Sequence, residues 1–228
     1  MNQIPDDTLR DIICDPIDYK LTIAGHFLGK ITSSIPKEGS FEYFLLETNI
    51  NAFLFFSSSV IDIIKVEINN RFDLFDKENV FYIHGIRKKL GNSGIQKQVK
   101  DIIVKYFSVP TYHEQLDFDT KSDRIIKTKQ GYFDATESIL WELQILRNKA
   151  THGKILNITD HKVSLDFTVR GLKGQEKPSK YQITTENPNE YFLHIFENLA
   201  YFVKQIRLLN PQKTQSFHHV EQRDFRLE

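Results

Sequence analysis

The most constraining feature of this 228-residue chain is one long apolar segment, which runs from Phe41 to Asn69. Large apolar side chains recur in it at helical spacing, and Ser40, directly before it, is a residue type that caps helix starts. This stripe consists of Phe41, Phe44, Leu45, Ala52, Phe55, Phe56, Val60 and Ile63. Leu46, Phe53 and further apolar residues lie outside it. A helix that is apolar on several sides must be covered by neighbours, so the segment predicts either a central helix or an oligomer interface.

Three further segments have helical patterns. The second helix is expected over Ile83–Phe107, broken at Gly91–Gly94 and stopped by Pro110. The third carries Ile139, Leu140, Leu143, Leu146 and Ala150, with Asp134 or Thr136 as its cap and Gly153 as its stop. The fourth begins at Asn187-Pro188-Asn189-Glu190, a cap followed by a proline and an acidic residue, and ends before Pro211. These patterns predict a mainly α fold.

The remaining segments are shorter or more polar. Residues 161–186 contain two alternating apolar and polar runs, which predict a β-hairpin inserted between the third and fourth helices. Residues 1–39 are expected to be irregular and to pack on the helices, with Tyr19–Ile23 as one strand or short helix. Thr111–Gly131 is expected to be a loop, and residues 211–228 a flexible tail. The helical domain is therefore predicted over residues 40–210.

Composition excludes several classes of protein. Lys and Arg number 30 and balance 30 Asp and Glu, so any nucleic-acid contact must be local. Cys14 is the only cysteine, which excludes an intramolecular disulfide and fits a reducing compartment. No secretory signal is visible, and the most apolar stretch, Ala52–Ile64, is too short for a membrane span. No histidines stand at metal-ligand spacing. We therefore expect a cytoplasmic protein with no membrane association, no metal and no cofactor.

The candidate catalytic residues lie in the segment Arg147-Asn148-Lys149-Ala150-Thr151-His152, at the end of the third helix. Arginine keeps its charge and can hold two phosphate oxygens with its planar fork. Histidine, with an ordinary pKa near neutrality, can move the proton of an attacking hydroxyl. Arg147 and His152 are therefore candidates for cleavage of a phosphodiester, with Asn148 as the polar neighbour that orients them.

This order of Arg147, Asn148, three residues and His152 resembles the motif of the HEPN superfamily (higher eukaryote and prokaryote nucleotide-binding). The stretch Asn49–Glu67 also looks like the first helix of that family. The resemblance implies a four-helix up-and-down bundle, often dimeric. It implies a metal-independent endoribonuclease of a toxin, defence or RNA-processing system, and therefore RNA, a second copy of the chain and an antitoxin or other protein as partners. The predicted hairpin and residues 1–39 lie outside the minimal pattern.

Helix geometry opposes a site within one chain. Residues five apart on a regular helix are rotated by about 140° from each other. Arg147 and His152 can therefore meet only if the helix ends or distorts between them, or if two chains complete the site across a two-fold axis. Asp62 and Glu67 on the first helix are expected either to lie buried beside the third helix, where a carboxylate could pair with Arg147, or to be exposed polar positions at the rim of an oligomer. The basic runs Arg87-Lys88-Lys89, Lys97, Lys100 and Arg124, Lys127, Lys129 could guide RNA or form a solvated face.

Two other interpretations remain open. In the first, Arg147 only interacts with the negative end of its helix and His152 bonds a carbonyl or faces water. In the second, the chain is a non-catalytic RNA-binding or protein-binding module, whose apolar first helix supplies a dimer or partner interface.

Overall fold

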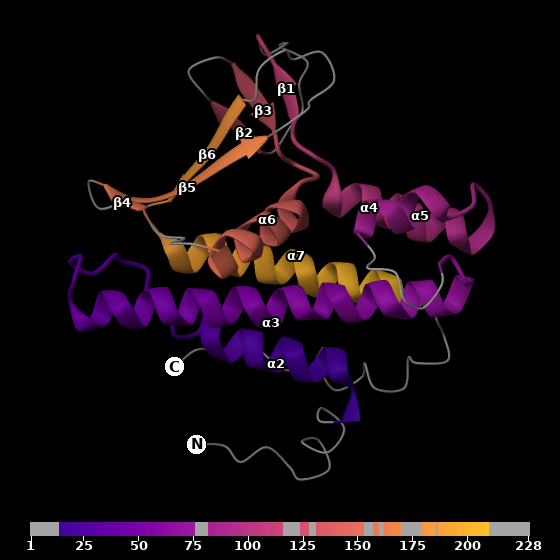
Figure 1. The fold of residues 1–228 in the computed structure, drawn as a ribbon, viewed down its shortest axis with the longest axis horizontal. Helices are drawn as coiled ribbons and strands as arrows, with labels where there is room; N and C mark the ends of the chain where they lie inside the picture. The colour runs from indigo at the N-terminus through magenta and orange to yellow at the C-terminus, as the bar shows by residue number, and fades with distance from the viewer. Residues whose placement is uncertain are drawn as a thin grey trace.

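The computed structural model describes residues 14–75, 82–115, 124–127, 131–152, 157–159, 162–169, 179–185 and 187–209. The predicted tail and residues 1–13 lie outside this part. The described chain is mainly helical, as expected, with two small antiparallel sheets of three strands each. Figure 1 shows the helices in the lower half and both sheets above them.

The first described helix decides between the two alternatives for Tyr19–Ile23, a strand or a short helix, in favour of a helix, and corrects the expectation of an otherwise irregular segment. Helix α2 spans Pro16–Leu28 and therefore includes the β-like run Tyr19–Ile23. The Asp15 side chain accepts hydrogen bonds from the amides of Ile17 and Asp18, and Pro16 holds the first helical position. Ile17, Ala24 and Leu28 are buried at helical spacing, so tertiary burial decides the conformation.

Helix α3, Phe41–Phe72, is the long apolar helix, and Ser40 caps it as expected by accepting from the Tyr43 amide at 3.2 Å. It packs against α2, α4, α6 and α7, which confirms its central place. By length and composition alone it is the one helix of the described chain that could cross a membrane; 44% of its most apolar window is buried. Core helices of soluble proteins can have the same length and apolar composition.

The second predicted helix is indeed broken, into α4, Ile83–Lys89, and α5, Gly94–Phe107. The expected loop Thr111–Gly131 is wrong in part, because β1 (Thr111–His113), β2 (Ile125–Lys127) and β3 (Tyr132–Asp134) form a sheet in the order β1-β3-β2. Residues 116–123 and 128–130 of that segment lie outside the described chain. Phe133 in the middle strand is fully buried, which anchors this sheet on the helices.

Helix α6 spans Ile139–His152 and α7 spans Pro188–Leu208. The predicted cap Asp134 accepts from the Thr136 amide instead, and Ser138 precedes the helix. Asn187 caps α7 as expected, through the Glu190 amide at 3.2 Å. Between α6 and α7 lie β4 (Asn157–Thr159), β5 (Lys162–Val169) and β6 (Ser179–Thr185). β5 and β6 pair antiparallel, which confirms the hairpin, and β4 adds a third strand.

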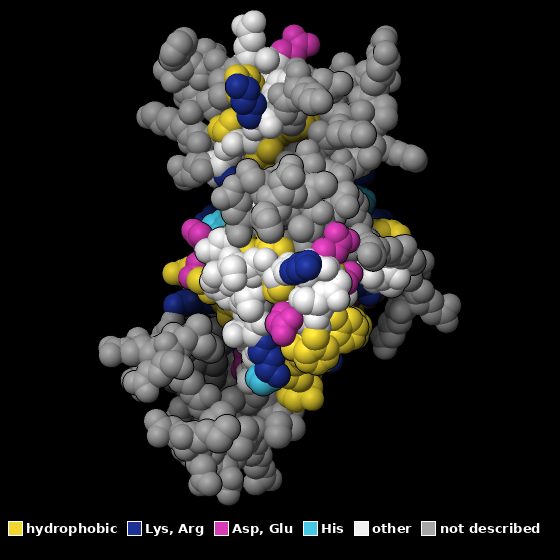
Figure 2. All heavy atoms as spheres, turned by 90° about the vertical axis from the view of Figure 1, so that its left-hand side faces the viewer, with side chains coloured by type: hydrophobic (Ala, Val, Ile, Leu, Met, Phe, Trp, Pro, Cys, Tyr) yellow, Lys and Arg dark blue, Asp and Glu magenta, His cyan; other side chains and the backbone are white. Residues whose placement is uncertain are grey.

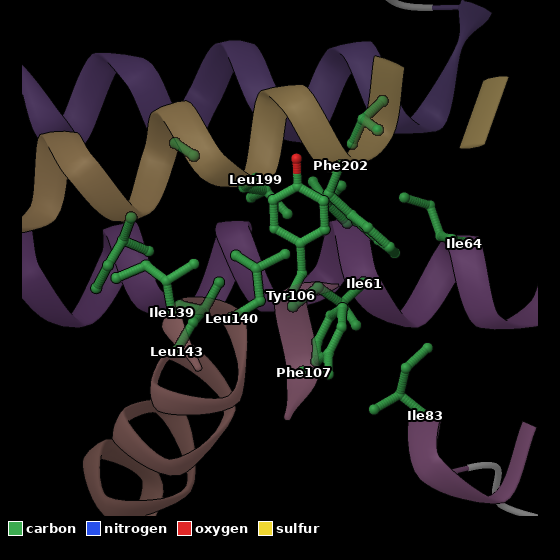
Figure 3. Packing of buried hydrophobic residues seen from close by; sticks show 14 of the residues in the cluster. Ile61, Ile64, Ile83, Tyr106, Phe107, Ile139, Leu140, Leu143, Leu199 and Phe202 are labelled. Atoms are coloured by element: carbon green, nitrogen blue, oxygen red, sulfur yellow. The ribbon is translucent and has the colours of Figure 1, made fainter. Parts of the chain in front are cut away.

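The core lies where α3, α5, α6 and α7 meet. Figure 3 shows Tyr106 and Phe107 of α5 among Leu199 and Phe202 of α7, with Leu140 and Leu143 of α6 and Ile61 and Ile64 of α3 around them. The Phe202 ring meets both α5 rings edge to face, with centroids 5.7 and 5.2 Å apart.

The direction of the helices differs from an up-and-down order. Phe53 of α3 contacts Phe192 at the start of α7, and Ile68 lies beside Ile206 near its end, so α3 and α7 run parallel. In an up-and-down order of α3, α5, α6 and α7, the first and last helices would be antiparallel. The sheet β1-β3-β2 lies between α5 and α6 in the chain, in the place where an up-and-down bundle has a short reversing loop (Figure 1).

Candidate functional site

The candidate site lies at the C-terminal end of α6. Leu140, Leu143 and Leu146 are fully buried and fix this helix on the core. The helix continues to His152, so the motif Arg147–His152 occupies its last turns, as the sequence predicts. The Thr151 hydroxyl donates to the Arg147 carbonyl oxygen at 2.9 Å, which satisfies one of the carbonyls near the helix end.

Arg147 and Asn148 are brought together. Arg147 is half-buried and Asn148 is exposed, and Nη1 of Arg147 donates to Oδ1 of Asn148 at 3.3 Å. No carboxylate in the described part of the chain lies within ion-pair distance of Arg147. An uncompensated guanidinium at a surface is available to an anion from outside, and phosphate suits its fork.

The place of His152 is defined by the backbone. It is the last residue of α6, five positions after Arg147 in an unbroken helix. The expected helix ending between the two residues is therefore not found, and the rotation of about 140° between them remains. The His152 side chain lies outside the described atoms. Within one chain the structure therefore brings together Arg147 and Asn148, and it places His152 by its backbone alone.

The expected carboxylate partners of Arg147 are elsewhere. Asp62 is exposed and pairs with Lys65 on its own helix at 2.5 Å. Glu67 lines a small cavity together with Arg71 and Arg207 near the other end of α3. Asp62 therefore pairs with Lys65 and not with Arg147, and its exposed position agrees with the alternative of a surface residue.

A buried polar cluster on α6 was missed by the sequence analysis. Glu142 is completely buried, and its Oε2 accepts from Nη2 of Arg124 at 2.7 Å and from the Tyr191 hydroxyl at 3.0 Å. These three residues join the segment directly before β2, helix α6 and the first turn of α7. A signal existed in the sequence, because Glu142 stands three residues after Ile139 and four before Leu146, on the apolar face of its helix.

Metal binding has no support in the described residues. They contain no group of three or more His, Cys, Asp or Glu side chains that could hold an ion. Cys14 is exposed.

Comparison with known proteins identifies no relative of this chain. No family model matches the sequence, and no curated protein or solved structure is significantly similar to it.

Proposed function

We propose that this chain is a metal-independent endoribonuclease of HEPN type, in which Arg147 holds the scissile phosphate and His152 moves the proton. The observation that supports it best is the Arg147 guanidinium, which lies next to exposed Asn148 and has no carboxylate partner among the described residues. The mainly helical fold is the coarse architecture that the resemblance implies, whereas the parallel α3 and α7 depart from its up-and-down bundle.

The proposed reaction is an internal transfer of the RNA phosphate. The 2′-oxygen forms a bond to the adjacent phosphorus and gives its proton to a base, for which His152 is the candidate. The bond from phosphorus to the 5′-oxygen breaks, and this oxygen takes up a proton. The products are a 2′,3′-cyclic phosphate and a 5′-hydroxyl. Arg147 binds the non-bridging oxygens, on which negative charge grows.

The helix geometry makes a dimer part of the proposal. Because Arg147 and His152 diverge on one helix, an active site would take Arg147 from one chain and His152 from the other. The surface we propose for that contact is the outer face of α3. Phe41, Phe44 and Phe55 are 68%, 59% and 54% exposed there, although large apolar groups favour burial.

Two features suit this face to a second copy of itself. The hydroxyls of Thr48 and Ser59 donate hydrogen bonds to the carbonyl oxygens of Phe44 and Phe55, each at 2.8 Å, so these polar groups are satisfied within the helix. A two-fold axis at Thr48 would also set Phe44 opposite the small Ala52 of the partner, and Phe41 opposite Phe55. Figure 2 shows hydrophobic side chains gathered on the end of the molecule where α3 begins.

Charges flank this face in a complementary way. The Lys20 ammonium lies 5.0 Å from the centroid of the Phe56 ring. The same two-fold axis sets residue 56 opposite residue 40 of the partner, near Glu38 and Glu42. Lys20 of each chain would then approach acidic residues of the other.

Cleavage of a labelled RNA pool in EDTA tests the activity. We expect cleavage by the wild-type protein and loss in Arg147→Ala and His152→Ala, while Arg71→Ala, which removes another exposed arginine, stays active. Co-expression of the two inactive variants tests the shared site. About half of the dimers would be mixed, each with one intact site, so roughly a quarter of the activity should return. No recovery would place both residues in one chain, and wild-type inactivity would contradict the nuclease.

The second candidate is a non-catalytic RNA-binding module, favoured by the basic surface described next. RNA binding by Arg147→Ala and by the wild-type protein with equal affinity, and cleavage by neither, would support it.

A further inference from the structure

The pair of helices α4 and α5 concentrates positive charge in a chain that has none overall. Lys and Arg balance Asp and Glu over the whole sequence, whereas residues 82–107 contain six basic residues and one acidic residue, Asp101. The basic residues are Arg87, Lys88, Lys89, Lys97, Lys100 and Lys105. In Figure 1 the two helices lie at the opposite side of the molecule from the connection between α2 and α3.

The fold places these cations on the solvent side. Val99, Ile103, Tyr106 and Phe107 form the buried face of α5, and Ile83 and Ile86 that of α4. Lys97 and Lys105 are exposed on the other side of α5, and Lys88 is exposed on α4. The turn between the helices is held by a hydrogen bond from the Gly91 amide to Oε1 of Gln96 at 2.7 Å. The two helices therefore present their cations on one fixed scaffold.

The charge is not neutralised within the described chain. None of the six basic residues forms an ion pair with a described carboxylate, whereas Lys65 on α3 pairs with Asp62. Lys100 donates to the side-chain oxygen of Asn92 at 2.7 Å, a neutral amide that leaves its charge uncompensated. Lys89 lies over the Phe75 ring at 5.6 Å from the centroid. The surface therefore attracts anions.

Two aromatic rings stand at the edge of this surface. Tyr82 is 67% exposed, and its ring stacks on His84 with centroids 5.6 Å apart and an angle of 23° between the planes. His84 is also exposed and lies one helical turn before Lys88. A nearly parallel exposed ring pair can stack with an unpaired base, and such stacking tolerates any base sequence.

We propose that the solvent faces of α4 and α5 bind single-stranded RNA, with the lysines on the phosphates and the Tyr82–His84 ring pair against a base. A single-stranded nucleic acid offers phosphates and free base faces together, and the proposed ribonuclease activity selects RNA over DNA. This inference rests on the proposed function for its choice of RNA, and it assigns a substrate-holding surface separate from Arg147.

Binding to a fluorescein-labelled 12-nucleotide RNA, followed by anisotropy over a range of KCl concentrations, tests the surface. All proteins carry Arg147→Ala, so the probe stays intact whether or not the chain is a nuclease. Lys88→Glu combined with Lys97→Glu should weaken binding by about tenfold or more and reduce the slope of log affinity against log salt by about 0.7 for each contact removed. Tyr82→Ala should weaken binding with an unchanged slope, because stacking releases no counterions.

The matched control is Lys30→Glu combined with Lys37→Glu. Both residues are exposed in the connection between α2 and α3, so this variant has the same net charge and should bind like the parent. If both double variants weakened RNA binding equally, the loss would come from the change in net charge and not from this surface, and the proposal would be overturned. Binding to phosphatidylserine vesicles in preference to RNA would also overturn it. RNA binding by this surface without wild-type cleavage would contradict the nuclease alone.

Discussion

Replacing Arg207 with methionine would remove the cation from a buried ion network between the two ends of the described chain. Arg207 is 3% exposed, and its Nη2 and Nη1 donate to Asp15 Oδ1 at 2.6 Å and Asp18 Oδ1 at 2.8 Å. Methionine fills much of the same volume, so the main effect is electrostatic. Removing one partner of a buried ion pair costs about 3–5 kcal/mol, because the remaining charge is uncompensated. We expect the free energy of unfolding to fall by that amount near neutral pH.

The loss of stability in Arg207→Met should depend on pH in a definite direction. Burial raises the pKa of Asp18, the positive charge of Arg207 lowers it, and the charge of Asp15 raises it. Without Arg207 the pKa of Asp18 in the folded protein should rise further. When a carboxyl group has a higher pKa in the folded than in the unfolded state, the protein becomes more stable as the pH falls through the pKa of the folded state. The deficit of the variant should therefore shrink as the pH falls toward the ordinary aspartate pKa.

Urea denaturation followed by circular dichroism at several pH values measures both effects. Arg71→Met, which removes an exposed arginine from α3, is the control and should change stability by less than about 0.5 kcal/mol. Adding Asp18→Asn to Arg207→Met should restore part of the loss, because one buried charge disappears. A deficit below about 1 kcal/mol, or one that is the same at every pH, would refute the argument from buried charge.

Three further substitutions test other parts of the fold, each by chemical denaturation. Tyr191→Phe loses the hydrogen bond to Glu142 and should cost about 1–2 kcal/mol; no change would mean that this bond contributes nothing net. Asn187→Ala removes the cap of α7 and should cost about 1 kcal/mol, whereas glycine there should cost only a few tenths. Gly131→Ala would set a methyl group 2.6 Å from the His113 carbonyl oxygen at a φ of 154°, so it should cost more than about 2 kcal/mol; a neutral result would contradict this packing.

The sequence predicts best where local signals agree with burial. Asn187 and Pro188 mark the start of α7, and its apolar stripe faces the core as expected. Ser40 likewise marks the start of α3. In both places the cap and the apolar face lie within one segment, so no distant part of the chain is needed to decide the structure.

Prediction fails where distant partners decide the structure. The sequence left Tyr19–Ile23 open between a strand and a short helix, and the packing of this segment on α3 and α7, which buries Ile17 and Ala24, decides for a helix. The strands β1, β2 and β3 have three residues each, too few for alternation to be visible, and they exist through their pairing. Such pairings cannot be inferred from one sequence.

The candidate site was predicted only in its local part. Arg147 and Asn148 are neighbours on the predicted helix, so their contact follows from the sequence. The acid that α6 buries is Glu142, which pairs with Arg124 from a segment expected to be a loop. Spacing alone could not name that partner, because the sheet that carries Arg124 was not foreseen.

The packing of the C-terminal helix α7 on the N-terminal part of the chain governs how this protein can fold during synthesis. Phe53 packs on Phe192, and the Asp15 carboxylate accepts a hydrogen bond from Arg207, which lies 192 residues later in the chain. Contacts so distant in sequence form late, because a long loop must close before they stabilise anything. A ribosome-bound chain that has emerged only as far as α6 therefore shows the apolar face of α3 that α7 later covers. During that interval the most apolar helix is the surface on which the nascent chain would aggregate or recruit a chaperone.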